Sequence, residues 1–344
     1  MTLNIQKRLT DDFYLLYQNK TLLRAVYLAT NAVDDLHRSP HLSSRTQQLL
    51  CTILASLNHD LHQATGQQSS LTMMIILVLL FAAEALQDSE AIVSHLDGVR
   101  RLLMIRNHAL TTLDAKLVFK IQQVDLRLAL ASGQSLRLTL DDTVTQGLSA
   151  TPIVLLEPVQ KLSVHSPVVI EAFERLQALT QHIKDAMRTR TDLKWEAFQS
   201  QINNIQMQLL QPKNSCISDN DDALRLGMLA FLTTLSRSPI RRPDLPELHM
   251  QFEESFIKLR SCGEAHRTFV TWVMMMGFLS VIETSNPLVG VLWDEIADCD
   301  LSWEVMRERI RAEKLPWIGF VHDGQAKSVF IYLQAQRARS GHIE

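Results

Sequence analysis

The sequence predicts an all-α fold, a large irregular helical domain with roughly ten or more helices around a buried core. Glycine contributes only 11 of the 344 residues, whereas Leu, Ala, Gln and Met are plentiful, and this balance favours helix over sheet. Hydrophobic residues make up 46% of the chain, which is enough apolar material for a sizeable core. Strand-like alternation and an alignable repeat are both missing. We therefore expect one domain over 1–344, with 133–166 and 211–222 as the places where an internal break would fall.

Helices are expected along most of the first 133 residues. The last four of these helices are opened by a Ser, Thr or Asp that can cap the first turn, and two of them end at a glycine. The expected ranges are 12–30, 43–66, 69–87, 88–106 and 111–133, with caps at Ser43 or Ser44, Ser69 or Ser70, Asp88 or Ser89, and Thr112, and with ends at Gly66 and Gly133.

The second part of the chain starts with a long loop over 133–169, which is rich in Pro, Gly, Ser and Thr. Helix returns with Ser166 as cap and Pro167 at the first helical position. A polar linker over 211–221 and a proline-rich segment over 238–248 interrupt the later helices. The expected helices are 166–188, 192–211, one opened by Asp221-Asp222, 247–260, 263–283, 286–297 and 302–313, followed by a short tail.

Two runs, Leu71–Ala83 and Phe269–Ile282, are apolar around the full helical circumference. A membrane span needs about 20 apolar residues, and shorter runs of this kind are typical of buried core helices. The N-terminus lacks the apolar stretch of a signal peptide. We expect both runs at the centre of the fold, no membrane association, and a cytoplasmic or nuclear protein.

Charge and cysteine content argue against a nucleic-acid reader and a zinc module. The net charge is −3, and the longest basic runs are the pairs Arg100-Arg101 and Arg241-Arg242. A basic face would have to be assembled in space, for which Arg241, Arg242, Arg307, Arg309 and Arg311 are the candidates. The four cysteines are dispersed without a C-x-x-C pair, which is typical of reduced structural thiols: Cys51, Cys216, Cys262 and Cys299.

The common catalytic motifs do not occur, so the sequence predicts no catalytic residue, no cofactor and no metal site. His59 and His62 lie one helical turn apart, but further ligands cannot be identified. Paired acids at Asp34-Asp35, Asp141-Asp142 and Asp221-Asp222 raise the alternative of a terpene cyclase. They lack the third acid and the partner motif of that family, and helix capping explains them better.

The stretch AIVSHLDGVRRLLMIR (91–106) predicts an amphipathic helix, with Ile92, Leu96, Val99 and Leu103 on one face. Gly98 lies in its middle, where glycine costs about 1 kcal/mol relative to alanine. We expect close packing against another helix to offset that cost. The pair Arg100-Arg101 leaves the apolar stripe and should face acids or solvent.

The same stretch, EAIVSHLDGVRRLLMIRN, followed by LDAKLVFKIQQVDLRLALASGQ, resembles the signature of the fungal-specific transcription factor domain. That family has a His-Leu-x-Gly-x-x-x-(Leu/Met) helix and then a helix with a central Asp and an Ala-x-x-x-Gly end. The matching positions here are His95, Leu96, Gly98, Leu102, Asp125, Ala129 and Gly133.

The resemblance continues toward the C-terminus and covers about residues 45–320. HRTFVTWVMMMGFLSVIETSNPLVGVLWDEI is similar to the family's Trp-containing apolar helix, and LSWEVMRERIRAEKLPWI to its closing helix and Pro/Leu-Trp end. The tryptophans that match are Trp272, Trp303 and Trp317. Full members begin with a six-cysteine zinc cluster that reads DNA, and this chain lacks one, so the resemblance implies the regulatory domain alone.

What the resemblance implies is a nuclear transcription-regulatory protein, connected with fungal secondary metabolism, that does not bind DNA directly. Its partners would be proteins, either a second copy of itself or a zinc-cluster transcription factor, and a small-molecule effector is compatible with the family. A missed upstream exon would supply the zinc cluster. The alternatives are a helical enzyme or small-molecule-binding protein that reuses the fold, and an inert scaffold.

Overall fold

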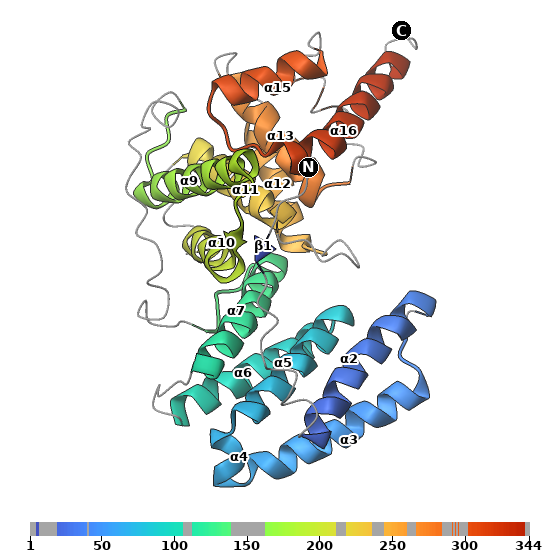
Figure 1. Cartoon of the computed structure of the whole chain (residues 1–344). Coiled ribbons are helices and arrows are strands. Elements are labelled where there is room, and N and C mark those ends of the chain that lie inside the picture. The colour runs from blue at the N-terminus through green and yellow to red at the C-terminus, as the bar shows by residue number, and fades with distance from the viewer. Residues whose placement is uncertain are drawn as a thin grey trace. The chain divides into compact units, whose positions relative to one another are not determined.

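The computed structural model confirms the all-α class (Figure 1). It describes residues 5–6, 19–39, 41–105, 112–138, 162–210, 218–235, 244–259, 266–283, 291, 293, 295 and 302–340. Within these ranges it has 13 helices, and the strands are a parallel pair of two residues each. The predicted helix over 286–297 and the two acids Asp141-Asp142 lie largely or wholly outside the described residues.

The chain divides into two compact units, each with its own hydrophobic core. The smaller unit comprises 7–129 and 136–144, and the larger unit comprises 1–6, 130–135 and 145–344. The division crosses the chain close to residue 133, where an internal break was one sequence-based alternative. The single domain expected over 1–344 stays a prediction.

The smaller unit is a helical layer built around α5. Its core comes from apolar positions of every helix but the short α4, and α5 is surrounded by α2, α3 and α6. Of the run Leu71–Ala83, Phe81 is exposed and most other side chains are buried, which confirms the predicted central helix. The elements are α2 (Lys20–Arg38), α3 (Ser44–Leu61), α4 (Ala64–Gln68), α5 (Ser70–Ala85), α6 (Ser89–Ile105) and α7 (Thr112–Ser132), of which the part up to Ala129 belongs to this unit.

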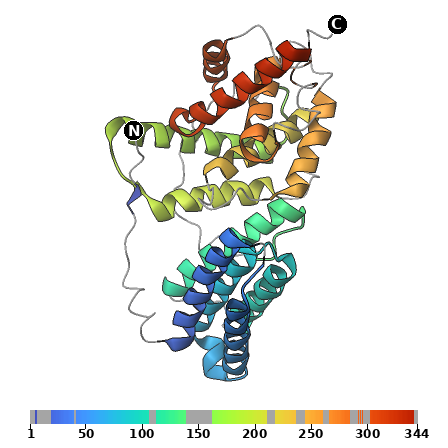
Figure 2. The same ribbon diagram turned by 90° about the vertical axis from the view of Figure 1, so that its right-hand side faces the viewer.

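The larger unit is centred on α11 and α13, which pack against each other (Figures 1 and 2). The side chains of both helices are buried on nearly all sides. The predicted buried run Phe269–Ile282 is confirmed, since its side chains are buried except that of the half-buried Val281. The elements are β1 (Ile5–Gln6), α9 (Pro167–Thr189), β2 (Leu193–Lys194), α10 (Trp195–Leu209), α11 (Asp219–Leu235), α12 (Pro246–Leu259), α13 (Arg267–Ser280), α15 (Trp303–Ala312) and α16 (Gly319–Ser340).

Helix starts follow the predicted caps closely. The hydroxyl oxygens of the predicted caps Ser43, Ser69 and Ser166 each accept a hydrogen bond from a backbone N–H of the first turn. Ser302, for which no cap was predicted, does the same at the start of α15. Asp88 does the same at the start of α6, where its carboxylate accepts from the N–H of Ala91 at 3.0 Å. The short polar side chains therefore fix where these helices begin.

Several element boundaries differ from the sequence prediction. The helix predicted over 12–30 is described from Lys20 and continues to Arg38, while residues 12–18 lie outside the described residues. The predicted helix 43–66 is broken at His62 and Gln63 into α3 and α4. The helix predicted to open at Asp221-Asp222 begins at Asp219. The expected short tail is instead α16, a helix of 22 residues that buries His322, Ala326, Phe330 and Leu333 along one side. Helical spacing of apolar residues did not reveal this buried side, because two of its four residues are the polar His322 and the small Ala326.

Candidate functional site

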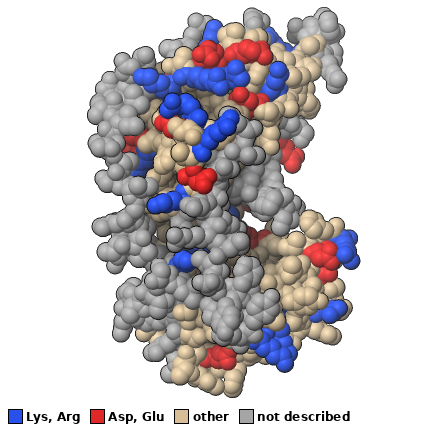
Figure 3. Space-filling model, viewed as in Figure 1, with Lys and Arg blue, Asp and Glu red and all other residues tan. Residues whose placement is uncertain are grey.

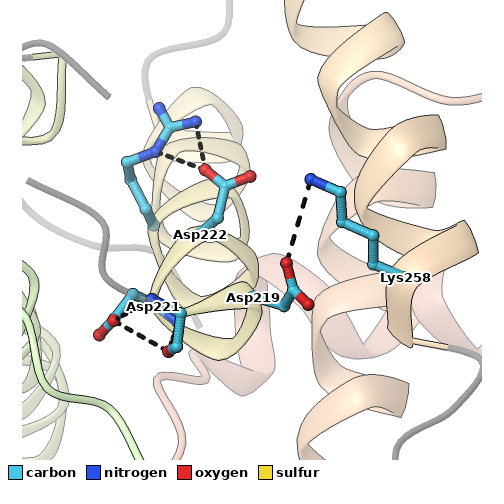
Figure 4. A network of polar contacts seen from close by, with 6 residues as sticks. Asp219, Asp221, Asp222 and Lys258 are labelled. Atoms are coloured by element: carbon cyan, nitrogen blue, oxygen red, sulfur yellow. Dashed lines mark hydrogen bonds and ion pairs between the residues drawn. The ribbon is translucent and has the colours of Figure 1, made fainter. Parts of the chain in front are cut away.

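Among the described residues of the larger unit, a dense polar arrangement surrounds Asp221 in the first turn of α11 (Figure 4). One carboxylate oxygen accepts the backbone N–H groups of His165 and Ser166 at 2.8 and 2.9 Å. The other accepts the N–H and hydroxyl of Ser218 at 2.8 and 2.9 Å, while the Ser218 oxygen accepts the N–H of Asp221 at 3.1 Å. Asp221 therefore closes a capping box and also holds the start of α9.

The pKa of Asp221 reflects these contacts. Burial alone would raise the pKa of this carboxyl group, but the donors from Ser166, His165 and Ser218 outweigh it and lower the pKa below its ordinary value. The group is thus held as a carboxylate with its lone pairs occupied by donors. This arrangement positions backbone segments and does not resemble an acid poised for proton transfer.

A chain of polar contacts runs from α11 to α12. Arg225 is 6% exposed in its side chain and donates to Asp222 at 2.8 Å and to Gln251 at 2.9 Å. Gln251 in turn donates to Glu247 at 2.7 Å. On the same end of α11, Asp219 faces Lys258 of α12 across 4.0 Å (Figure 4). The two residues of the predicted acidic pair therefore have different structural roles: Asp221 holds the start of α9, and Asp222 pairs with Arg225.

His322 of α16 is a buried titratable group that sequence reasoning did not single out. Its Nδ1 accepts the N–H of Ile318 at 3.1 Å, and its Nε2 lies 2.9 Å from the hydroxyl oxygen of Thr234. The Thr234 hydroxyl donates to the carbonyl of Phe231 at 2.6 Å, so Nε2 carries the proton of a neutral imidazole. The residue joins α16 to α11, and the sequence carried no motif that could have revealed it.

The three signature tryptophans of the larger unit are buried. Trp272 donates its indole N–H to the carbonyl of Pro316 at 2.8 Å. Trp317 donates to Asp323 at 2.7 Å, and Arg307 reaches the same carboxylate at 3.1 Å. The rings of Trp303 and Trp317 lie 6.3 Å apart, a common separation for packed aromatic pairs. These side chains hold α13, α15 and α16 together.

In the smaller unit the signature residue Asp125 fixes the turn that follows α7. Its carboxylate accepts the backbone N–H groups of Arg137 and Leu138 at 2.9 and 2.8 Å. Arg137 also bonds Asp97 of α6 at 3.1 Å. Burial raises the pKa of the Asp125 carboxyl group, and the two N–H donors and the Arg137 charge offset only part of this effect. Asp125 thus ties residues 137–138 back to α7.

The other signature residues also have structural positions. Leu96 is buried in the core of the smaller unit, and His95 beside it is half-buried, which lowers its pKa. Gly133 ends α7 with a φ of 67°, a conformation that favours glycine. A β-carbon at Gly133 would lie 2.5 Å from Cγ of Glu247.

The prediction for Gly98 is wrong. Ile92, Leu96, Val99 and Leu103 do form the buried face of α6, but a β-carbon built on Gly98 would meet nothing within 4 Å. The glycine therefore lies toward open space. Periodicity identified the buried stripe correctly, yet it could not show how far the neighbouring helices extend around α6.

Other sequence candidates can be placed only in part. His59 and His62 each contact a neighbour on α3 or just beyond it, Gln63 and Asn58 respectively. Cys51 is an exposed free thiol, whereas Cys216, Cys262 and Cys299 lie outside the described residues. Among described residues, no three His, Cys, Asp or Glu side chains cluster as a metal site would require. A helix both long and apolar enough for a membrane span is likewise not found there.

Arginines proposed to assemble a basic face are partly neutralised. Arg307 pairs with Asp323, and Arg311 lies 4.0 Å from Glu308, while Arg241 and Arg242 fall outside the described residues. Figure 3 shows Lys and Arg side chains interspersed with Asp and Glu over the described part of one face. The described surface in that view therefore has mixed charge.

Comparison with known proteins yields no match to a family model, to a curated protein or to a solved structure.

Proposed function

We propose that this chain is a transcription-regulatory protein, similar to the regulatory domain of fungal zinc-cluster transcription factors and dependent on a protein partner for DNA recognition. The proposal rests on the sequence resemblance. The observation that best supports it is the pair Asp125 and Gly133, which secure the end of α7 by a buried carboxylate and a left-handed glycine. Both signature positions thus have a physical reason for their residue type.

Dependence on a partner follows from the charge of the chain. Non-specific affinity for DNA comes mainly from phosphates neutralised by Lys and Arg, and the net charge here is −3. Several arginines of the larger unit are already paired with carboxylates. We expect the isolated protein to bind duplex DNA no tighter than about 10⁻⁵ M at physiological salt. Nuclear location and a role in secondary metabolism belong to the same proposal.

A tethering experiment tests regulation directly. The chain is fused to an unrelated DNA-binding domain in a fungal cell, and transcription of a reporter with the matching site is measured. A reproducible rise or fall relative to the DNA-binding domain alone is expected. An unchanged reporter, with the fusion present in the nucleus at normal level, would refute the regulatory role.

A fluorescence-anisotropy titration of the purified chain tests the need for a partner. Mixed-sequence and candidate promoter duplexes are titrated at two salt concentrations. Binding that is weak, unselective and strongly salt-dependent is expected. Submicromolar and sequence-selective binding would show that the chain reads DNA by itself.

A further inference from the structure

The exposed side of α6 near its C-terminal end carries an unusual set of side chains, which we call the α6 face: Arg100, Arg101, Met104 and Ile105. Residues four apart on a helix lie one above the other, so Arg100 stands over Met104 and Arg101 over Ile105. Met104 is 60% exposed and Ile105 is 48% exposed. Two apolar and two basic side chains therefore form one continuous surface.

Among the residues that the structure describes, the arginines of this face have no partner. Neither Arg100 nor Arg101 forms an ion pair or hydrogen bond with a described residue, and both are exposed. Asp97, one helical turn before Arg101, is bonded to Arg137 at 3.1 Å. The position of Gly98 is open as well, since a β-carbon there meets nothing within 4 Å. Beside the α6 face, the described residues therefore leave the position of Gly98 uncovered, whereas Asp97 is covered by Arg137.

We propose that the α6 face is a docking surface for an acidic, amphipathic segment of a protein partner. Carboxylates of such a segment would pair with Arg100 and Arg101, and its apolar side chains would cover Met104 and Ile105. Arginine and methionine are enriched in protein interfaces, and exposed apolar side chains gain free energy when a partner removes them from water. This inference rests on the proposed partner-dependent function and names the chemistry of one partner surface.

Two other occupants fit the face less well. A second copy of the chain, paired about a two-fold axis, would bring the arginines of one copy against those of the other. Duplex DNA would use the arginines but would gain nothing from Met104 and Ile105. Only an acidic segment with apolar residues satisfies all four side chains. A face of this size buries less than the roughly 1,200 Å² of a stable interface, so the affinity should be micromolar.

The test uses the full chain and a fluorescein-labelled 20-residue peptide. In this peptide Leu recurs every three or four residues, so that it lies on one face of a helix, and Glu occupies the other face. A scrambled peptide of the same composition serves as the comparison. Anisotropy is measured for the wild type, for Arg100→Glu with Arg101→Glu, and for Met104→Ser with Ile105→Ser. Arg100→Gln with Arg101→Gln is a milder version that leaves no acid at the helix end. Lys20→Glu with Lys194→Glu is the matched control, because both lysines are exposed and the net charge changes equally.

The wild type should bind the patterned peptide more tightly than the scrambled one, and both Arg double variants should lose about tenfold in affinity, whereas the lysine control should not. The Met104–Ile105 variant should also lose affinity but keep the salt dependence. The proposal would be overturned if the wild type did not bind the peptide, or if the lysine control lost as much affinity as the Arg variants. It would also be overturned if sedimentation showed that the wild type is a dimer and the Met104–Ile105 variant is not. Equal affinity for duplex DNA, unaffected by the Met104–Ile105 change, would assign the face to nucleic acid instead.

The peptide titration tests the α6 face and the tethered reporter tests the regulatory role, so a negative result in one can be told apart from a negative result in the other. An active reporter with no peptide binding refutes the α6 face alone. Peptide binding that depends on the α6 face, with an inactive reporter, refutes the regulatory role and leaves a docking protein of another kind.

Discussion

Gly227 of α11 lies directly against the indole ring of Trp272 in α13, so that a β-carbon at Gly227 would be 2.6 Å from Cζ3 of Trp272. The ring has no room to retreat, because Trp272 is fully buried and its N–H is bonded to the carbonyl of Pro316. The close approach of the two central helices of the larger unit therefore requires glycine at this position.

Gly227→Ala should destabilise the larger unit by about 1–3 kcal/mol through overpacking. All 5 tryptophans of the chain follow residue 194, so tryptophan fluorescence during urea unfolding reports on the larger unit. Gly324→Ala is the matched control, since a β-carbon there meets nothing within 4 Å, and it should not destabilise. An unfolding midpoint of Gly227→Ala equal to that of the wild type would contradict the packing described.

Gly98→Ala should have the opposite sign. Because the β-carbon meets no neighbour, the substitution gains helix propensity without a clash, and the gain should be about 1 kcal/mol. Thermal unfolding followed by circular dichroism at 222 nm measures it. Gly98→Leu should also be tolerated. A lower melting temperature for Gly98→Ala would contradict this and would support the close packing at Gly98 that the sequence suggested.

Asp221→Asn should cost about 1–3 kcal/mol, because an amide cannot accept from all the donors that converge on the carboxylate. Free energies of unfolding from urea titrations followed by tryptophan fluorescence give the value. Asp219→Asn changes the same charge next to it at a more exposed position and should cost less. Equal losses of unfolding free energy for Asp221→Asn and Asp219→Asn would mean that the hydrogen bonds of Asp221 do not stabilise the fold beyond the effect of its charge.

The pH dependence of Asp221 has a defined sign. Its pKa is lowered in the folded state, so its contribution to stability is present above the unfolded value of about 3.9 and is lost as the pH falls through the folded value. Wild-type stability should therefore drop below about pH 4, and the drop should be smaller in Asp221→Asn. Asp125→Asn should not reduce this drop, because the pKa of Asp125 is raised. Parallel pH curves for wild type and Asp221→Asn would exclude the linkage.

The sequence predicted the helices well where a single local signal decides them. Ser43, Ser69 and Ser166 cap helices as expected, since capping depends only on a few neighbouring residues. The two fully apolar runs are central because no amphipathic surface position could accommodate them.

Long-range contacts could not be predicted in the same way. Asp221 was interpreted as a local cap, and its bonds to His165 and Ser166, 55 or more residues earlier, depend on how α9 meets α11. Gly98 and Gly227 are both mid-helix glycines, yet one faces open space and the other a tryptophan. Helical spacing gives the face of a residue but not the distance of the neighbour that it meets.

The last prediction separates backbone strain from steric conflict at Gly133. Two effects disfavour a side chain at this position. The backbone of Gly133 has a φ of 67°, and Cγ of Glu247 would lie 2.5 Å from a β-carbon there. Glu247 cannot swing away freely, because its carboxylate accepts the Gln251 amide at 2.7 Å. Gly133→Ala should therefore cost more than the about 1–2 kcal/mol of a left-handed residue alone.

A double-mutant cycle with Glu247→Ala isolates the steric part. In the Glu247→Ala background, the cost of Gly133→Ala should fall to the strain of about 1–2 kcal/mol, which gives a favourable coupling between the two substitutions. Gln251→Ala is the control, since it breaks the same polar chain to Arg225 but leaves the Glu247 side chain in place. It should relieve less of the cost than Glu247→Ala does. Additive effects of Gly133→Ala and Glu247→Ala, measured by urea unfolding, would show that strain alone requires the glycine and that Glu247 yields without cost.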